Sequence, residues 1–194
     1  MQDLVKTEVI NDWMLVIDGA LDEAVCDSIV QEAESNLKNS GILGEQISKY
    51  RTSRDSFLST GSELNDILDN LIEDWISIPK ENFERASVIN YLPDQEYKQH
   101  YDFLYHIEGE TDTAGDRTYT AVFYLNDDFT GGETFFPKLD YAVKPKKGRL
   151  VIWKNYIDGF SNFQSLHTGQ KVITGEKWIA TKWVREKKYI QGET

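Results

Sequence analysis

The stretch Lys177-Trp178-Ile179-Ala180-Thr181-Lys182-Trp183 has the composition of a β-strand, and it ends a series of similar runs that begins after residue 84. These runs are short, rich in Val, Ile, Thr, Tyr, Phe and Trp, and separated by turn-forming residues. They cover residues 85–91, 97–105, 118–125, 133–136, 149–153, 164–167, 170–173 and 177–184. Many short strands with this spacing predict an antiparallel sandwich or jelly roll.

Before residue 79 the sequence predicts mainly helices. Asp22 and Ser62 are candidate N-caps, and an apolar stripe with helical spacing follows each of them. A short strand is predicted over residues 13–17. The polar segment 40–60 contains glycines and many serines, and we expect a mobile loop or a weak strand there. Because helices come first and strands afterwards, we expect an α+β fold with N-terminal helices packed on one sheet.

Composition limits the classes of function. The 194 residues are enough for one domain, and 21 basic against 33 acidic residues give a net charge of −12, which disfavours nucleic acids and anionic membranes as partners. The chain has neither a membrane-spanning apolar run nor a signal-like N-terminus, so we expect a cytoplasmic protein. The single cysteine, Cys26, is interpreted as a packing residue. Any metal must therefore be bound by histidine and carboxylate side chains.

His100-Tyr101-Asp102 is the first candidate metal-binding pair. In a strand, positions i and i+2 lie on the same face, so the imidazole and the carboxylate would converge. A hydrogen-bonded surface pair is the alternative interpretation. His167 is the best candidate for a third ligand, whereas His106 lies among acidic residues and is interpreted as a solvated loop histidine. Two histidines and one carboxylate leave coordination positions open, which suits an Fe(II) oxygenase.

Lys177 is a candidate anion-binding residue. It shares a strand face with Ile179 and Trp183, which are expected to point inward, and no acidic residue lies on that face of the strand. A buried lysine needs an anion or a route to water. The strand alone leaves both possibilities open: Lys177 binds an anionic ligand, or it reaches solvent from the end of the strand.

These candidates lie within a longer resemblance. Residues 79–186 resemble the prolyl 4-hydroxylase branch of the Fe(II)/2-oxoglutarate dioxygenases, and the spacing of ten residues from His167 to Lys177 is the family's own. The chain departs from the family pattern at Asp94 and at Gln170-Lys171, where the loops and the fit of the substrate can differ. The matching segments are Val88–Tyr91, Gln95–Phe103, Arg117–Thr120, Gly131–Pro137, Ser165–Gly169 and Gly175–Trp183.

The resemblance implies a double-stranded β-helix, or jelly roll. Residues 1–194 would form a single dioxygenase domain, with helical support and a mobile loop in 1–78 and the jelly-roll core in 79–186. It also implies a role for each matching side chain. His100, Asp102 and His167 would bind Fe(II), Lys177 would pair with the distal carboxylate of 2-oxoglutarate, Tyr91 and Thr134 would assist Lys177, Trp183 would line the active site, and Arg117 would lie near the substrate groove.

The activity that the resemblance implies is hydroxylation of a prolyl residue in a peptide or protein. Fe(II), 2-oxoglutarate and O2 would be required, ascorbate would serve as reductant, and succinate and CO2 would be released. The first alternative is the same chemistry on a free amino acid or a non-proline side chain. The second is a non-catalytic binding module, which the intact ligand set and Lys177 disfavour. We expect no nucleic acid or membrane partner, and the sequence does not indicate the oligomeric state.

Overall fold

The computed structural model describes residues 6–40, 50–104 and 113–190, which form two α-helices, two short 3-10 helices and sixteen strands. The α-helices are α1 (Glu23–Glu34) and α2 (Glu63–Glu73), and the 3-10 helices are η1 (Lys80–Asn82) and η2 (Phe163–Ser165). The strands are β1 (Lys6–Asn11), β2 (Met14–Asp18), β3 (Lys38–Asn39), β4 (Arg54–Phe57), β5 (Ser87–Tyr91), β6 (Tyr97–His100), β7 (Arg117–Tyr124), β8 (Thr130–Gly131), β9 (Thr134–Phe136), β10 (Tyr141–Val143), β11 (Leu150–Lys154), β12 (Tyr156–Ile157), β13 (Phe160–Ser161), β14 (His167–Gly169), β15 (Val172–Thr174) and β16 (Lys177–Arg185).

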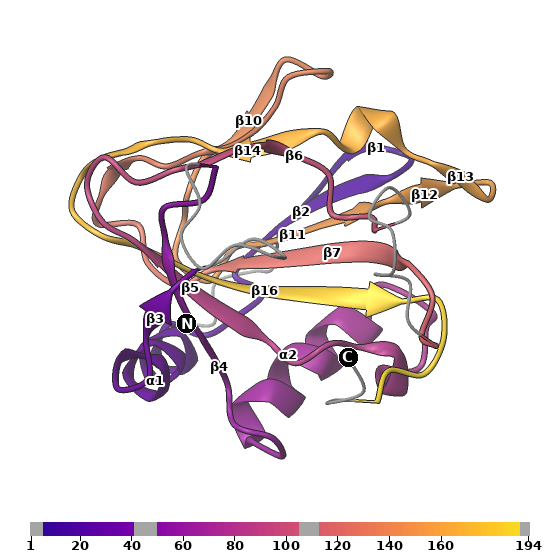
Figure 1. The fold of residues 1–194 in the computed structure, drawn as a ribbon, viewed down its shortest axis with the longest axis horizontal. Coiled ribbons are helices and arrows are strands. Elements are labelled where there is room, and N and C mark those ends of the chain that lie inside the picture. Colours follow the sequence, from indigo (N-terminus) through magenta and orange to yellow (C-terminus); the bar gives the residue numbers. More distant parts are fainter. Residues whose placement is uncertain (1–5, 41–49, 105–112, 191–194) are drawn as a thin grey trace.

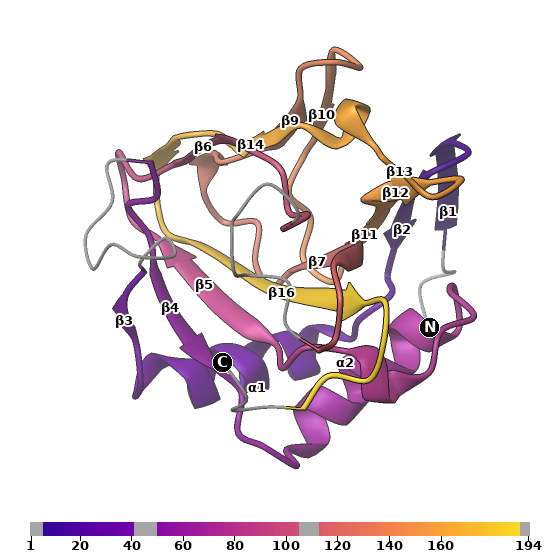
Figure 2. The ribbon, with the colours of Figure 1, turned by 45° about the vertical axis from the view of Figure 1, so that its right-hand side comes forward.

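Two sheets dominate the architecture. The larger has eight strands in the order β1-β2-β11-β7-β16-β5-β4-β3, and the smaller has four in the order β10-β9-β14-β6. Neighbouring strands in both sheets pair antiparallel. The smaller sheet faces one side of the larger sheet, while α1 and α2 lie on the other side (Figures 1 and 2). The prediction of an antiparallel sandwich or jelly roll is therefore confirmed.

The central strands of the larger sheet are buried on both faces, and β16 illustrates how the sequence achieves this. Alternate side chains of a strand point to opposite faces. Trp178, Ala180 and Val184 belong to the core cluster that also contains helical side chains, whereas Ile179 belongs to the cluster between the two sheets. Strands that are buried on both faces read as continuous apolar runs, and this explains the density of apolar residues after residue 84.

Both predicted helices are present, and each follows its predicted N-cap residue, Asp22 or Ser62. Side chains of both helices join the core cluster formed with the larger sheet; these are Cys26, Ile29 and Ala33 of α1 and Leu68 and Ile72 of α2. Cys26 is fully buried there, as expected for a packing residue, and burial raises the pKa of its thiol to about 11. In the described part of the chain, no helix is long and apolar enough to span a membrane.

Several predicted boundaries are wrong. The strand predicted over 97–105 ends at His100, and the strand predicted over 164–167 is a 3-10 helix up to Ser165. Strand β1 was not predicted; it forms a hairpin with β2 at the edge of the larger sheet. In the segment 40–60, for which a loop or a weak strand was predicted, residues Arg54–Phe57 form the strand β4 and pair with β5, in agreement with the second possibility. Residues 41–49 lie outside the described ranges.

A buried ion pair joins the sheet to the second helix. Lys182 lies on the helix-facing side of β16, and its Nζ is 2.5 Å from Oδ1 of Asp69 in α2. The Lys182 side chain is 1% exposed and that of Asp69 is 11% exposed. The Lys182 ammonium group also donates a hydrogen bond to Oδ1 of Asn65, and the same oxygen accepts a bond from the backbone N–H of Ala86.

Replacing Lys182 by methionine leaves the Asp69 carboxylate buried without its cation. We expect Lys182→Met to lower the free energy of unfolding by about 3–5 kcal/mol, as is typical when one partner of a buried ion pair is removed. Urea denaturation measures this loss. The double variant Lys182→Met/Asp69→Leu removes both charges and should recover much of the stability. If the double variant is as unstable as the sum of the single changes, the ion pair is not the cause.

Candidate metal and anion site

Three potential metal ligands come together between the two sheets. His100 ends β6 and His167 begins β14, and the two residues are register partners in the antiparallel pair of strands. Asp102 follows His100 by two residues. The ligand atoms of all three side chains lie within 4.8 Å of one another. Nε2 of His100 is 3.7 Å from Oδ1 of Asp102, and Nε2 of His167 is 3.7 Å from Oδ2.

The two imidazole rings are oriented by backbone carbonyl groups. Nδ1 of His100 is 2.7 Å from the carbonyl oxygen of Lys98, and Nδ1 of His167 is 2.9 Å from that of Ser165. A carbonyl oxygen can only accept a hydrogen bond, so each Nδ1 carries a proton, and in a neutral ring this leaves Nε2 as the atom with a lone pair for a metal. Burial, assisted by His167, lowers the pKa of His100 to about 3, and that ring is therefore neutral.

Asp102 completes a donor set that fits a divalent metal. Burial opposes ionisation of its carboxyl group, but His167, His100 and a hydrogen bond from Thr120 together hold its pKa below the usual value. Two imidazole nitrogens and one carboxylate on one side of an ion are typical of non-haem Fe(II) sites. The residues present therefore fit the metal expected from the sequence.

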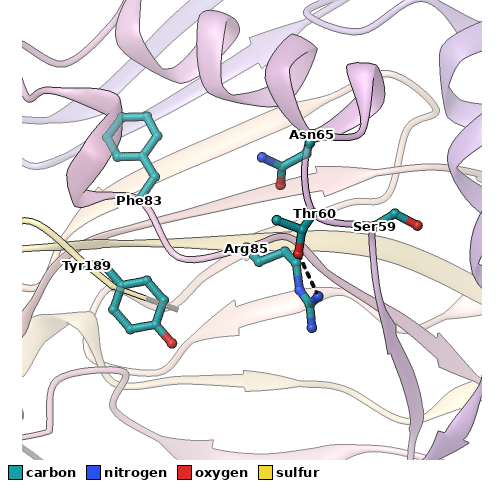
Figure 3. A pocket seen from close by; sticks show the side chains of 7 residues that line it. Ser59, Thr60, Asn65, Phe83, Arg85 and Tyr189 are labelled. Carbon is teal, nitrogen blue, oxygen red and sulfur yellow. Dashed lines mark hydrogen bonds between the residues drawn. The ribbon is translucent and has the colours of Figure 1, made fainter. Parts of the chain in front are cut away.

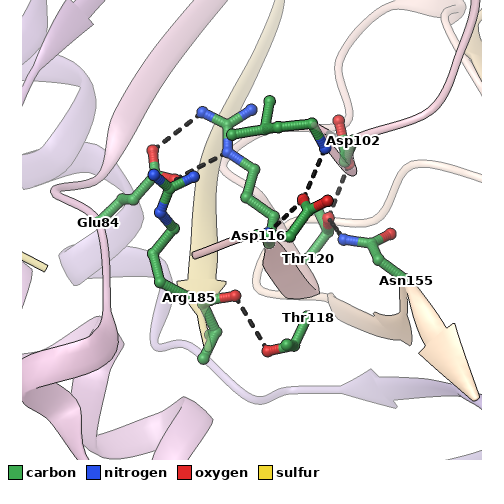
Figure 4. A network of polar contacts seen from close by, with 10 residues as sticks. Glu84, Asp102, Asp116, Thr118, Thr120, Asn155 and Arg185 are labelled. Atoms are coloured by element: carbon green, nitrogen blue, oxygen red, sulfur yellow. Dashed lines mark hydrogen bonds and ion pairs between the residues drawn. The ribbon is translucent and has the colours of Figure 1, made fainter. Parts of the chain in front are cut away.

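The route by which Asp102 reaches this position differs from the prediction. Asp102 was expected to share a strand face with His100, but the strand ends at His100. Beyond that residue the chain is held from the larger sheet: the Thr120 hydroxyl donates to Oδ2 of Asp102 at 2.7 Å, and the backbone N–H of Leu104 donates to Asp116 at 2.6 Å (Figure 4). Side-chain hydrogen bonds across the sheets, not strand alternation, bring the carboxylate to the histidines.

Lys177 lies at the start of β16 and is 1% exposed, so its side chain does not reach solvent. Its Nζ is 5.1 Å from the ring centre of Tyr91 and 5.7 Å from that of Tyr124. A Cβ atom at Gly169, two residues after His167, would lie 3.9 Å from the same Nζ. Burial lowers the pKa of Lys177 to about 7, with Glu133 opposing the shift. Within the described ranges Lys177 forms no ion pair, and the buried ammonium group thus favours an anionic ligand.

The tyrosines beside the lysine carry buried hydroxyl groups, and a threonine hydroxyl lies next to one of them. Thr134 begins β9, and its hydroxyl is 2.6 Å from the hydroxyl of the fully buried Tyr124. The Tyr91 hydroxyl, also buried, hydrogen-bonds with Ser53 and Arg51. Tyr124 was not among the predicted site residues. Thr120, Val122 and Tyr124 are spaced two residues apart along β7, so their side chains lie on one face of the strand. This spacing is the sequence signal that could have identified Tyr124 as a residue of the site.

Arg117 and Trp183 lie together at the far end of β7 and β16. The Arg117 guanidinium group is 3.7 Å above the Trp183 ring, and its Nε and Nη2 donate to the Glu84 carboxylate at 2.7 and 2.9 Å. Burial disfavours the charge of Arg117, but Glu84 outweighs this effect and raises the pKa of the guanidinium group. A guanidinium plane stacked on an aromatic ring and held by a two-point ion pair is a rigid element.

The predicted loop histidine and a pocket in the described part of the chain do not belong to this site. His106 lies outside the described ranges. A pocket of about 130 Å³ lies elsewhere and contains none of the predicted site residues. Its Arg85 guanidinium group donates to the Thr60 hydroxyl at 3.4 Å (Figure 3). The lining residues are Ser59, Thr60, Gly61, Asn65, Phe83, Arg85 and Tyr189.

Comparison with known proteins agrees with this geometry. The profile of the 2OG-Fe(II) oxygenase superfamily matches residues 86–185. Prolyl 4-hydroxylase 2 of Arabidopsis thaliana is 34% identical over an alignment of 197 positions, gaps included, that covers 87% of this chain. A putative prolyl 4-hydroxylase of Acanthamoeba polyphaga mimivirus is 30% identical over an alignment of 181 positions, gaps included, that covers 90% of this chain and 74% of the viral protein. The chain spans 66% of the length of the Arabidopsis protein.

A solved structure extends the similarity to the fold. The viral collagen prolyl hydroxylase of Paramecium Bursaria Chlorella virus-1, in its 2OG complex, superposes with a TM-score of 0.73 at 30% sequence identity. The match covers 90% of this chain and 97% of the viral chain. A prolyl-4-hydroxylase of Pseudomonas putida superposes with a TM-score of 0.61 at 21% identity, covering 86% of this chain and 89% of the other, and so supports the fold alone.

The three-ligand geometry predicts that loss of His167 weakens metal binding. We expect His167→Ala to bind Mn(II) at least 10–100-fold more weakly than the original protein, because even residues that only support a ligand commonly contribute that much. Calorimetric titration of the metal-free protein measures the affinity, and circular dichroism checks that the fold is retained. Unchanged Mn(II) affinity in folded His167→Ala would rule out this cluster as the metal site.

Proposed function

Since the chain belongs to the prolyl 4-hydroxylase branch of the 2OG-Fe(II) oxygenase superfamily, we propose that it hydroxylates a prolyl residue in a peptide or protein. The reaction consumes 2-oxoglutarate and O2, releases succinate and CO2, and is sustained by ascorbate as reductant. The observation that carries the proposal is the cluster of His100, Asp102 and His167 in the same inter-sheet space as the buried Lys177. Residues 1–194 act as one domain, with 1–78 supporting the jelly-roll core in 79–186.

Each predicted side chain has a role in this proposal. His100, Asp102 and His167 bind Fe(II) through two neutral nitrogens and one carboxylate. Bound Fe(II) supplies the activation of dioxygen that is coupled to decarboxylation of 2-oxoglutarate. Lys177 pairs with the distal carboxylate of 2-oxoglutarate, and the hydroxyls of Thr134, Tyr124 and Tyr91 complete its polar surroundings.

Burial of these groups makes the lysine effective. A charge-assisted pair in a water-poor space is stronger than one at the surface, and it fixes the orientation of the ligand. Lys177, Thr134 and Tyr124 are all buried, as is His167. The protein thereby orients 2-oxoglutarate from one end, and the packed core between the sheets keeps water from the reacting groups.

Arg117 and Trp183 are proposed to position the peptide. Glu84 holds the arginine against the indole ring, so both side chains present fixed surfaces. The remaining edge of the guanidinium group donates to a backbone carbonyl of the substrate, and the indole contacts the proline ring. A prolyl segment suits such a surface because its fixed φ angle lowers the entropy lost on binding.

The lowered pKa of Lys177 predicts pH-dependent binding of 2-oxoglutarate. With a pKa of about 7, Lys177 is mostly neutral at pH 8 in the free protein, whereas the bound carboxylate requires the ammonium form. Binding therefore takes up close to one proton at pH 8. Affinity should fall by up to about tenfold per pH unit as pH rises above 7, until the pKa of the complex is reached.

Calorimetry of 2-oxoglutarate binding to the Mn(II)-loaded protein measures this uptake, because the apparent enthalpy then depends on the ionisation enthalpy of the buffer. Lys177→Met is the control and should bind 2-oxoglutarate weakly without proton uptake. Affinity that is constant from pH 7 to 9, with no buffer dependence, would show that Lys177 does not carry the pairing charge.

The substrate class is tested with three matched compounds: a proline-containing peptide, the same peptide with alanine in place of proline, and free proline. We expect succinate formation coupled to a product 16 mass units heavier only with the first, and no product with His167→Ala. Mass spectrometry and a succinate assay measure both products. If free proline is hydroxylated and the proline-containing peptide is not, a peptide substrate is contradicted. If none of the three compounds is hydroxylated, prolyl hydroxylation itself is contradicted.

A further inference from the structure

A hydrogen-bonded chain leads from a buried amide to the carboxylate of the candidate metal site. The Asn155 side-chain nitrogen donates to the Thr120 hydroxyl at 3.0 Å, and that hydroxyl donates to Oδ2 of Asp102 at 2.7 Å. Asn155 and Thr120 are fully buried, and Asp102 is 6% exposed. Figure 4 shows the three side chains in sequence, each pointing toward the next.

The direction of this chain follows from the chemistry of its members. An ionised carboxylate has no proton to donate, so Thr120 must give its single hydroxyl proton to Asp102. The Thr120 oxygen can then only accept, and the group that faces it must be a donor. Only the NH2 end of the Asn155 amide meets this requirement. Reversing the amide would place a carbonyl oxygen against Thr120 and compete with Asp102 for the proton.

Backbone contacts fix the position of Asn155. It follows β11 directly, its N–H donates to the carbonyl of Thr118 at 2.7 Å, and its own carbonyl accepts from the N–H of Asn162 at 2.8 Å. Its side-chain oxygen Oδ1 is buried and has no hydrogen-bond partner within the described part of the chain. The bond to Thr120 is therefore the contact that sets the orientation of the amide.

We propose that Asn155 is a positioning residue for the metal site, acting through the Thr120 hydroxyl to hold the Asp102 carboxylate in one orientation. This inference rests on the metal site of the proposed function. The amide polarises the hydroxyl, and hydrogen bonds in series strengthen one another. The bond from Thr120 occupies Oδ2 and restricts rotation of the carboxylate, so Asp102 meets the metal already oriented. Asn155 itself hydrogen-bonds to Thr120, and it acts on the metal ligand Asp102 only through that hydroxyl group.

Co(II) titration of the metal-free full chain tests the proposal, because Co(II) reports both affinity and coordination through its visible absorption spectrum. We expect Asn155→Ala to weaken Co(II) binding by about 10–100-fold, the usual effect of residues that orient metal ligands, and to change the spectrum. Thr120→Val should act similarly, while Thr120→Ser, which keeps the hydroxyl, should retain the original spectrum. Asn155→Ala in the Thr120→Val background should cause no further loss.

Asn155→Asp provides a second test with almost unchanged shape. Aspartate accepts but does not donate, so it should weaken Co(II) binding at least as much as alanine. Asn82→Ala is the matched control: Asn82 is buried and donates to the carbonyl of Arg185, outside this chain of hydrogen bonds. It should lower stability and leave Co(II) affinity within twofold. For a variant that is marginally stable, the rise in melting temperature on adding Co(II) supplies the comparison.

The outcomes separate this proposal from the function on which it rests. Co(II) affinity within twofold of the original protein in Asn155→Ala or Asn155→Asp would overturn it, as would additive losses in the double variant. If His167→Ala abolishes Co(II) binding while the Asn155 variants retain it, only the role of Asn155 is wrong. If His167→Ala also retains Co(II), the metal site itself is wrong.

Discussion

Strand β16 carries two buried lysines on opposite faces, and each needs a counter-charge. Lys182 faces the helices and meets Asp69 within the protein. Lys177 faces the smaller sheet, and within the described ranges it lies beside two tyrosine rings and forms no ion pair. Asp69 thus compensates the buried ammonium group of Lys182 within the protein. Lys177 has no such partner among the described residues, and a buried ammonium group without one favours an anionic ligand. Because β16 lies at the centre of the larger sheet, Lys177 is held in the interior beside the candidate metal ligands, and the candidate site depends on this unpaired charge.

The candidate site depends on both sheets at once. His100 and His167 come from the smaller sheet, whereas Lys177, Thr120 and Tyr124 come from the larger one. The packed side chains between the sheets therefore set the distance from the three candidate metal ligands to Lys177. The hydrogen bonds from Thr120 to Asp102 and between Tyr124 and Thr134 cross the same space, and buried, satisfied hydrogen bonds of this kind favour one alignment of the packed elements. The contacts that hold the two sheets together are therefore also the contacts that position the residues of the candidate site.

The sequence allowed prediction of features that depend on local periodicity. The helices were predicted from their apolar stripes, and strand alternation gave an inward Lys177 as one of two possibilities, which its burial decides. Asp102 was correctly predicted to lie near His100, but the reason given, a shared strand face, was wrong. Strand β6 ends at His100, and Asp102 is held instead by Thr120 of β7. Tyr124 was accessible to the same alternation argument and was missed. Asn155 was beyond local reasoning, because its role exists only through contact with residues far away in sequence.

The central position of β16 also has a consequence for the order of events in folding. It is the last strand in the described chain, yet it lies between β7 and β5 and separates the two halves of the larger sheet. Such pairing between distant segments raises contact order and slows folding. During synthesis, residues up to 176 emerge from the ribosome with a gap in the sheet and no Lys177. Lys177 therefore reaches its place between the two sheets only after β16 has been inserted between β7 and β5.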